Sequence, residues 1–221
     1  MFNPSIKYSS EVLYYTFGAY LDARLKAEPI TAGLVSLFEK AQRELIASND
    51  RELKARLAGQ VALAARDHEG LEMERLVSKF EDALSYVVDR EHDSPMYRQF
   101  FPNGKAGESE LTAIHRVGRV KLIEASLADL MSGSTTKPEI ASATVKTVVD
   151  ALAVKTWIAK LSDQRLKLEA SIAVWQDSLV AYANAFRAEV HERNEWTIAY
   201  RLIYAKLLEL FPADRKKVES F

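Results

Sequence analysis

The amino-acid sequence predicts an all-α fold, an elongated helical bundle of about six helices, two of them long. The first observation is that residues 139–211, between Pro138 and Pro212, contain neither Gly nor Pro, the residues that most strongly interrupt helices. The second is that apolar residues recur at steps of three and four, the spacing of one helix face. The third is the composition: 48% hydrophobic and 28% charged residues are typical of a folded domain.

Charge and cysteine content narrow the class of protein. The net charge of the 221 residues is −1, which gives no global field that would attract nucleic acid or an anionic membrane. The chain has no Cys, which excludes disulfides, thiol catalysis and thiolate metal sites. It also has no run of about 18 uncharged apolar residues that could span a membrane. We therefore expect a cytoplasmic protein without nucleic-acid or membrane partners.

The first half of the chain is expected to hold three helices. Ser9 or Ser10 can cap the first helix, which Pro29 ends, and Thr31 can cap the second, which should end near Ala47. The third helix is expected over residues 49–91, because an Asn followed three residues later by a Glu has the spacing of a capping box. Its apolar row consists of Leu53, Leu57, Val61, Ala64, Leu71, Leu76, Phe80, Leu84 and Val87.

The second half follows a connection over residues 92–107 that contains Pro and Gly. One helix is expected to begin at Ser109, and a short loop should follow at residues 133–137. The chain should then fold back at residues 161–163, because Ser and Asp can cap a new helix. Residues 163–210 would form the second long helix. Before the fold-back, a separate apolar stripe opens at Pro138 and consists of Ile140, Val145, Val148, Val149 and Leu152.

The two long helices are predicted to pack against each other. Each carries apolar residues at steps of three and four over more than 40 positions, and only a comparably long partner covers such a row. Trp175, Tyr182 and Phe186 are therefore expected to face the row that includes Leu57 and Val61. If the Phe186 ring is enclosed there, its truncation to Ala should cost about 3–5 kcal/mol.

The chain is expected to form a single domain over residues 1–221, and an internal duplication is one interpretation of its pattern. Two Phe-Pro pairs, Phe101 with Pro102 and Phe211 with Pro212, each follow a predicted long helix and lie 110 positions apart. That spacing would make residues 1–106 and 107–221 two pseudo-repeats. Chance reuse of helical patterns is the alternative.

The C-terminal third carries a pattern made of Trp157, Leu161, the run Ala-Asn-Ala-Phe at residues 183–186, and Arg193. This pattern resembles a family of uncharacterised bacterial all-helical proteins. The resemblance implies a helical fold and a bacterial source. It implies no activity, because none is known for the family.

Two His–Glu pairs are the candidate metal ligands. His68 with Glu72, and His191 with Glu195, are each four positions apart, which places both side chains of a pair on one helix face. If the two pairs met, they could hold one metal ion. A solvated or hydrogen-bonded pair is the simpler interpretation of each.

Other polar residues are weaker candidates for functional sites. Asp89 and His92 have a spacing of three, and Asp67 and Asp177 are candidate buried acids for which pairing or exposure is the expected state. Two basic segments, residues 115–121 and 215–217, are candidate nucleic-acid contacts, although a solvated helix face explains them equally.

The function that this sequence favours is not enzymatic. It contains no convergent catalytic set and no phosphate- or dinucleotide-binding motif. We therefore expect a helical bundle that acts in protein–protein interaction or assembly, through a protein partner or self-association, without a cofactor. A bundle that binds a metal or a small ligand is the alternative hypothesis.

Overall fold

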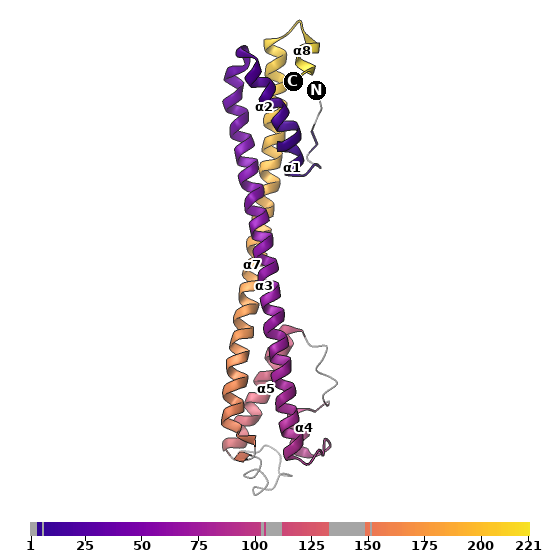
Figure 1. Cartoon of the computed structure of the whole chain (residues 1–221), viewed down its shortest axis with the longest axis vertical. Coiled ribbons are helices and arrows are strands. Elements are labelled where there is room, and N and C mark those ends of the chain that lie inside the picture. The colour runs from indigo at the N-terminus through magenta and orange to yellow at the C-terminus, as the bar shows by residue number, and fades with distance from the viewer. Residues whose placement is uncertain (1–3, 6, 103, 105–111, 133–148, 151) are drawn as a thin grey trace. The chain divides into compact units, whose positions relative to one another are not determined.

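The computed structural model describes residues 4–5, 7–102, 104, 112–132, 149–150 and 152–221. Throughout these ranges the regular structure is helical, which confirms the all-α prediction. Two helices are much longer than the others (Figure 1): α3, Ala32–Val87, with 56 residues, and α7, Val154–Leu210, with 57 residues. Much of the predicted stripe after Pro138, with Ile140, Val145 and Val148, lies outside the described residues, as do the loop at 133–137 and Ser109.

The chain divides into two compact units. The first unit comprises Met1–Gly59 and Ser178–Phe221, and the second comprises Gln60–Asp177. Both long helices cross this division, so each unit contains one part of α3 and one part of α7. The prediction of a single domain and of two pseudo-repeats at 1–106 and 107–221 therefore stays a prediction, since each unit draws on both halves.

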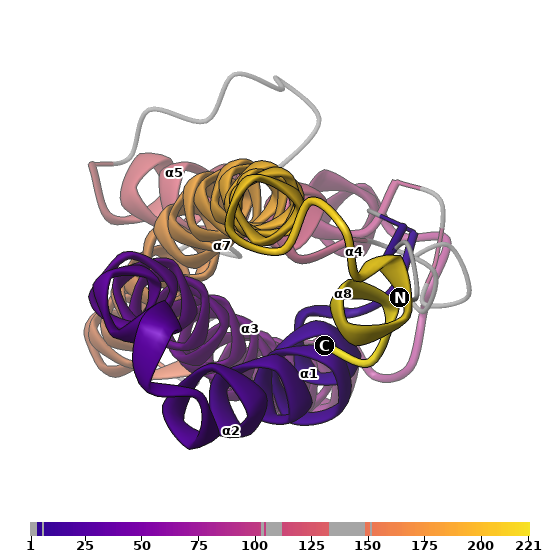
Figure 2. The same cartoon turned by 90° about the horizontal axis from the view of Figure 1, so that it is seen from above.

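The first unit is built around the start of α3 and the end of α7. Residues Ser10–Val12 (α1), Leu13–Gly18 (η1) and Ala19–Ala27 (α2) follow one another directly, and a 3₁₀ turn, Pro29–Thr31 (η2), leads into α3. The last helix is α8, Arg215–Glu219, which lies between α7 and the α1–α2 segment in Figure 2. The core consists of Leu13, Tyr14, Leu21, Leu25, Phe38, Leu45, Trp196, Tyr200, Ile203, Leu207, Val218 and Phe221.

The second unit has the same kind of plan. It joins the end of α3 and the start of α7 to α5, Ala113–Ser132, and to α4, Pro95–Phe100, which the Ser94 side chain caps. Arg165 of α7 is bonded to Glu124 of α5 at 3.0 Å. The core includes Met73, Val77, Phe80 and Leu84 of α3, Tyr97 and Phe100 of α4, Val120, Ile123 and Leu127 of α5, and Leu161 and Leu168 of α7.

Two predicted helix boundaries are wrong. The chain continues as α3 through Ala47 and Asn49, and as α7 through residues 161–163. A capping side chain contributes about 1 kcal/mol, whereas burying one large apolar side chain contributes about 1.5–3 kcal/mol. Leu45 and Leu161 are both fully buried beside these predicted breaks. The helix therefore continues where a cap signal suggested an end.

The predicted inner row of α3 is also wrong in its middle part. Val61 is 71% exposed and Leu71 is 52% exposed, and Leu57 is exposed as well. Because successive residues turn by about 100° around a helix, these positions lie opposite the buried row of Met73, Val77, Phe80 and Leu84. Toward the N-terminus of α3, this buried face continues instead through Gly70, Arg66 and Ala62. These inward residues are small or polar, so apolar spacing alone selected the wrong face.

The prediction of an enclosed Phe186 is wrong for a different reason. The ring lies on the same face of α7 as Leu168, yet it is 46% exposed. The core of the first unit contacts α7 only from Trp196 onward, so α1 and α2 leave Phe186 uncovered. Trp175 lies in the second unit, where the Arg66 guanidinium sits 4.1 Å from its ring centroid. The expected cost of 3–5 kcal/mol for Phe186→Ala therefore does not apply.

The buried rows of α3 and α7 share one numerical offset. Six buried positions of α3 each have a buried counterpart in α7 that lies 123 residues later. The pairs are Phe38 and Leu161, Leu45 and Leu168, Met73 and Trp196, Val77 and Tyr200, Phe80 and Ile203, and Leu84 and Leu207. The predicted offset of 110 is wrong for the long helices, because Phe101 follows the short helix α4 and not α3. An internal duplication stays a prediction.

Candidate functional site

The first unit contains a cavity beside a π-helix. The segment Leu13–Gly18 is wound as a π-helix, in which the N–H of Ala19 bonds to the carbonyl of Tyr14 five residues earlier. A π-turn holds one residue more than an α-turn and frequently marks a functional position. Here it places Tyr14 on the buried side, while Tyr20 is exposed. The rotated segment forms one wall of the cavity.

The side chain of Gln42 in α3 holds this wall against α7 through two hydrogen bonds. Its amide nitrogen donates to the Tyr14 carbonyl at 2.8 Å, and its amide oxygen accepts from the indole N–H of Trp196. A Cβ atom on Gly18 would overlap the Gln42 amide group. The absence of a side chain at Gly18 therefore allows Gln42 to bridge η1 and α7.

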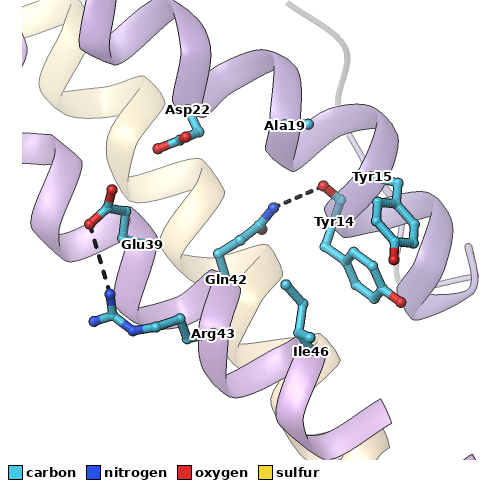
Figure 3. Close-up of a pocket in the computed structure, with 8 residues that line it drawn as sticks. All are labelled: Tyr14, Tyr15, Ala19, Asp22, Glu39, Gln42, Arg43 and Ile46. Carbon is cyan, nitrogen blue, oxygen red and sulfur yellow. Dashed lines mark hydrogen bonds and ion pairs between the residues drawn. The ribbon is translucent and has the colours of Figure 1, made fainter. Parts of the chain in front are cut away.

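The cavity, here named the Tyr14 pocket, has a volume of about 390 Å³. That volume is within the range of small-molecule sites, about 300–1,000 Å³. In Figure 3 the two tyrosines lie at one end and the charged side chains lie at the other. The lining residues are Tyr14, Tyr15, Ala19, Asp22, Glu39, Gln42, Arg43 and Ile46.

The charged end of the Tyr14 pocket is an ion-pair network. The Lys26 ammonium lies 2.8 Å from Asp22 Oδ2 and 2.8 Å from Glu39 Oε1, whereas Arg43 lies 3.8 Å from Glu39 Oε2. Hydrogen bonds to Asp22 and then to Glu39 raise the pKa of Lys26, and the bond from Lys26 lowers the pKa of Glu39. Lys26 and Glu39 are therefore both charged at neutral pH, and Arg43 lies farther from its carboxylate partner than Lys26 does.

One carboxylate oxygen in this network is unsatisfied. Asp22 Oδ1 is shielded from solvent and has no hydrogen-bond partner among the described residues. Buried polar atoms are nearly always paired with protein or water, so this oxygen is a vacant acceptor. At the other end, burial and the neighbouring Tyr15 raise the pKa of Tyr14 to about 12, which keeps its phenol protonated. The pocket thus combines an open acceptor, a guanidinium and two aromatic rings.

The predicted metal ligands lie elsewhere. His68 and Glu72 belong to the second unit, and His191 and Glu195 belong to the first. Both histidines are exposed, and Glu72 pairs with Arg75. Within the described ranges, no group of three or more His, Asp or Glu side chains is placed to hold a metal ion. No observation here favours the metal hypothesis, which stays a prediction.

The other candidate residues take part in local pairs. Asp67 pairs with Arg66 at 2.6 Å, which confirms the expected pairing, and Asp177 is exposed. The Nε2 atom of His92 lies 2.9 Å from the Ser85 hydroxyl and therefore has Ser85, not Asp89, as its hydrogen-bond partner.

Three basic side chains of the segments that were candidates for nucleic-acid contact form hydrogen bonds or ion pairs within the chain. Arg116 bonds to the Gly70 carbonyl and pairs with Glu74 at 3.0 Å, while Arg119 donates to the Phe100 carbonyl. In the tail, Lys217 pairs with Glu28 at 2.9 Å.

Sequence reasoning did not identify the Tyr14 pocket. Two i, i+4 pairs, Asp22 with Lys26 and Glu39 with Arg43, were visible signals, but such pairs are common on helix surfaces. What brings them together is the turn between α2 and α3 and the π-helix, and the latter has no sequence signature.

Comparisons of the chain with protein-family models, with curated proteins and with solved structures find no match. The resemblance to a bacterial helical family therefore stays a prediction. Within the described ranges, no helix combines the length and the apolar character needed to cross a membrane.

Proposed function

We propose that this chain is a non-enzymatic helical bundle that acts in protein–protein interaction or assembly. The observation that carries the proposal is an apolar face of α3 in the second unit. This α3 face, as we name it, consists of Val61, Ala64, Ala65 and Leu71, all of them exposed. Val61 and Leu71 present 71% and 52% of their surfaces to solvent. His68, which is also exposed, lies between Ala64 and Leu71 on this face. Apolar side chains that gather on one exposed face mark binding sites in soluble proteins more often than isolated apolar residues do.

The matched face of α7 shows that such a surface is not required by the fold. At the offset of 123 that relates the buried rows, Val61 corresponds to Asn184, Ala64 to Arg187 and Leu71 to Asn194. These three residues of α7 are polar and exposed. At these three positions the outer face of α7 is polar, whereas Ala65 corresponds to Ala188, which is also apolar and exposed. A binding role for the α3 face explains why Val61 and Leu71 are apolar where α7 carries Asn184 and Asn194.

The charges around the α3 face favour an apolar partner. Asp67 pairs with Arg66, and Glu72 pairs with Arg75. A partner that covers the face therefore has no unpaired ion to neutralise, and the burial of its own apolar side chains supplies the affinity. A helix with an apolar row, including the α3 face of a second copy, has the required chemistry.

Site-specific photo-crosslinking in cells that produce the chain tests this proposal. A benzophenone amino acid replaces Val61 in one variant and Asn184, the matched polar position, in the other. We expect discrete adducts from position 61, with the chain itself or with one partner, and none of these from position 184. A second change, Leu71→Lys, should abolish the adducts from position 61 because it places a charge within the contact. Identical adduct patterns from the two positions, or none from position 61, would contradict the proposal.

A further inference from the structure

The Tyr14 pocket has two ends of different chemistry. One end carries the rings of Tyr14 and Tyr15, whose centroids lie 4.3 Å apart, and the other carries the Asp22, Glu39 and Arg43 side chains (Figure 3). Most small-molecule sites combine an apolar lining with a few polar groups that fix the orientation of the ligand. A ligand with an apolar body and a polar end matches this arrangement.

Arg43 is available to an anionic group. The Lys26 ammonium lies 2.8 Å from both carboxylates, whereas the distance from Arg43 to Glu39 is 3.8 Å. An exposed pair of that length contributes little to stability, and Glu39 keeps its partner Lys26 if Arg43 moves away. A guanidinium has five N–H donors and binds a carboxylate through two of them at once. Arg43 can therefore bind a ligand carboxylate while Glu39 keeps its contact with Lys26, and the ligand must then bring one positive charge to restore the balance.

Asp22 is available to a hydrogen-bond donor. Its Oδ2 accepts from Lys26, while its Oδ1 is shielded and has no partner among the described residues. The terminal torsion of an Asp side chain has a broad energy minimum, so the carboxylate can turn toward a donor in the pocket. The Gln42 amide oxygen already accepts one hydrogen bond, from Trp196, whereas Asp22 Oδ1 accepts none among the described residues.

The charges of the four ionised side chains at this end of the pocket favour a ligand without net charge. Asp22 and Glu39 are matched by Lys26 and Arg43, so the network is neutral as a whole. A ligand with a net charge would disturb this balance in a partly shielded site, whereas a ligand with one charge of each sign would not.

We propose that the Tyr14 pocket binds a small zwitterion with an apolar body, the class to which free amino acids with aromatic side chains belong. The ligand ammonium donates to Asp22, its carboxylate accepts from Arg43, and its apolar body lies against Tyr15 and Ile46. This site is in the first unit and rests on observations separate from those for the α3 face. Either proposal can therefore fail without the other.

Isothermal titration calorimetry of the full chain with L-phenylalanine tests the proposal. Two analogues, 3-phenylpropionate and 2-phenylethylamine, keep the ring but lack the ammonium and the carboxylate respectively. We expect saturable binding of phenylalanine, and binding of each analogue weaker by about tenfold or more, because each loses a charge-assisted hydrogen bond. No saturable heat with phenylalanine at millimolar concentration would overturn the proposal, and so would an analogue that binds as tightly.

Two variants assign the binding to this pocket. Arg43→Gln and Asp22→Asn should each weaken phenylalanine binding by about tenfold or more, because each removes one charged partner of the ligand. The matched control is Arg51→Gln, an exposed arginine of α3 outside the pocket, which should bind like the unmodified chain. Circular dichroism establishes that all three variants fold. Unchanged affinity in both pocket variants would overturn the assignment.

Discussion

Gly18 shows how a single residue determines the geometry of the first unit. The Gln42 amide occupies the space where a Gly18 side chain would begin, and two hydrogen bonds hold that amide in place. In an ordinary helix interior, Ala is more favourable than Gly by about 1 kcal/mol. At this position the overlap with a fixed side chain should reverse that preference.

A double-mutant cycle on Gly18 and Gln42 tests this account. Alone, Gly18→Ala should lower the free energy of unfolding by about 1–3 kcal/mol, the usual effect of overpacking a filled space. In a Gln42→Ala background the overlap is gone, so the same change should be neutral or stabilising by up to about 1 kcal/mol. Chemical denaturation of the four proteins measures both values. Equal effects of Gly18→Ala in the two backgrounds would show that Gln42 does not fill this space.

At the residue scale, the sequence predicted correctly those contacts that form between residues close to each other in the chain. The pairing of Asp67 with Arg66 followed from adjacency, and the Ser9 side chain caps α1 as expected. It did not foresee that Tyr14 is buried and Tyr20 is exposed. The π-helix adds one residue to a turn, and this shifts the helical phase that the spacing rule assumes to be constant.

At the scale of the elements, the continuity of the long helices is the main correction to the sequence analysis. The signal at Asn49 and Glu52 is a genuine capping-box spacing, but it lies inside α3. Continuation preserves every backbone hydrogen bond there and keeps Leu45 buried. Local cap signals have values of about 1 kcal/mol, so packing on one side of a helix outweighs them.

The variant Asp50→Pro distinguishes a continuous α3 from one that restarts at Asn49. Asp50 would be the first residue of a helix capped by Asn49, a position at which Pro is well tolerated. In a continuous α3 the Pro ring removes a hydrogen bond and clashes with the preceding turn, so we expect a loss of about 3 kcal/mol or more. Asp50→Ala controls for the loss of the exposed carboxylate. Thermal denaturation in which Asp50→Pro matches Asp50→Ala would indicate a break at this point.

The inner face of α3 could not have been predicted from apolar spacing. The buried face between residues 62 and 70 is formed by Ala62, Arg66 and Gly70, and the larger apolar residues lie on the other side. Arg66 is accepted there because its guanidinium lies over the Trp175 ring at 4.1 Å and pairs with Asp67. A rule that places large apolar residues inward fails wherever those residues serve another surface.

At the scale of the whole chain, the two units contain similar sets of elements. Each contains a helix or helical segment of about 20 residues, parts of both long helices, and one short helix, α8 in the first unit and α4 in the second. Six buried residues of α3 have buried counterparts in α7 at an offset of 123 residues, and His68 and Glu72 correspond to His191 and Glu195 at the same offset. The similarity of these two pairs was visible in the sequence. The predicted offset of 110 came instead from the two Phe-Pro pairs, which follow helices of different length, α4 and α7.

The central claim is that the α3 face is covered by a protein in the cell, and cysteine protection measures this most directly. The chain has no Cys, so Val61→Cys and Asn184→Cys each introduce a single thiol at matched positions. Met73→Cys supplies the buried reference, since Met73 is fully enclosed.

The measurement is the rate at which a membrane-permeant maleimide labels each thiol, in cells and in the purified chain at high dilution. We expect the thiol at position 61 to react as fast as the thiol at position 184 in the dilute chain, and at least about tenfold more slowly in cells. The thiol at position 184 should react at a similar rate in both settings, and the thiol at position 73 slowly in both. Equal rates for positions 61 and 184 inside cells would contradict the claim.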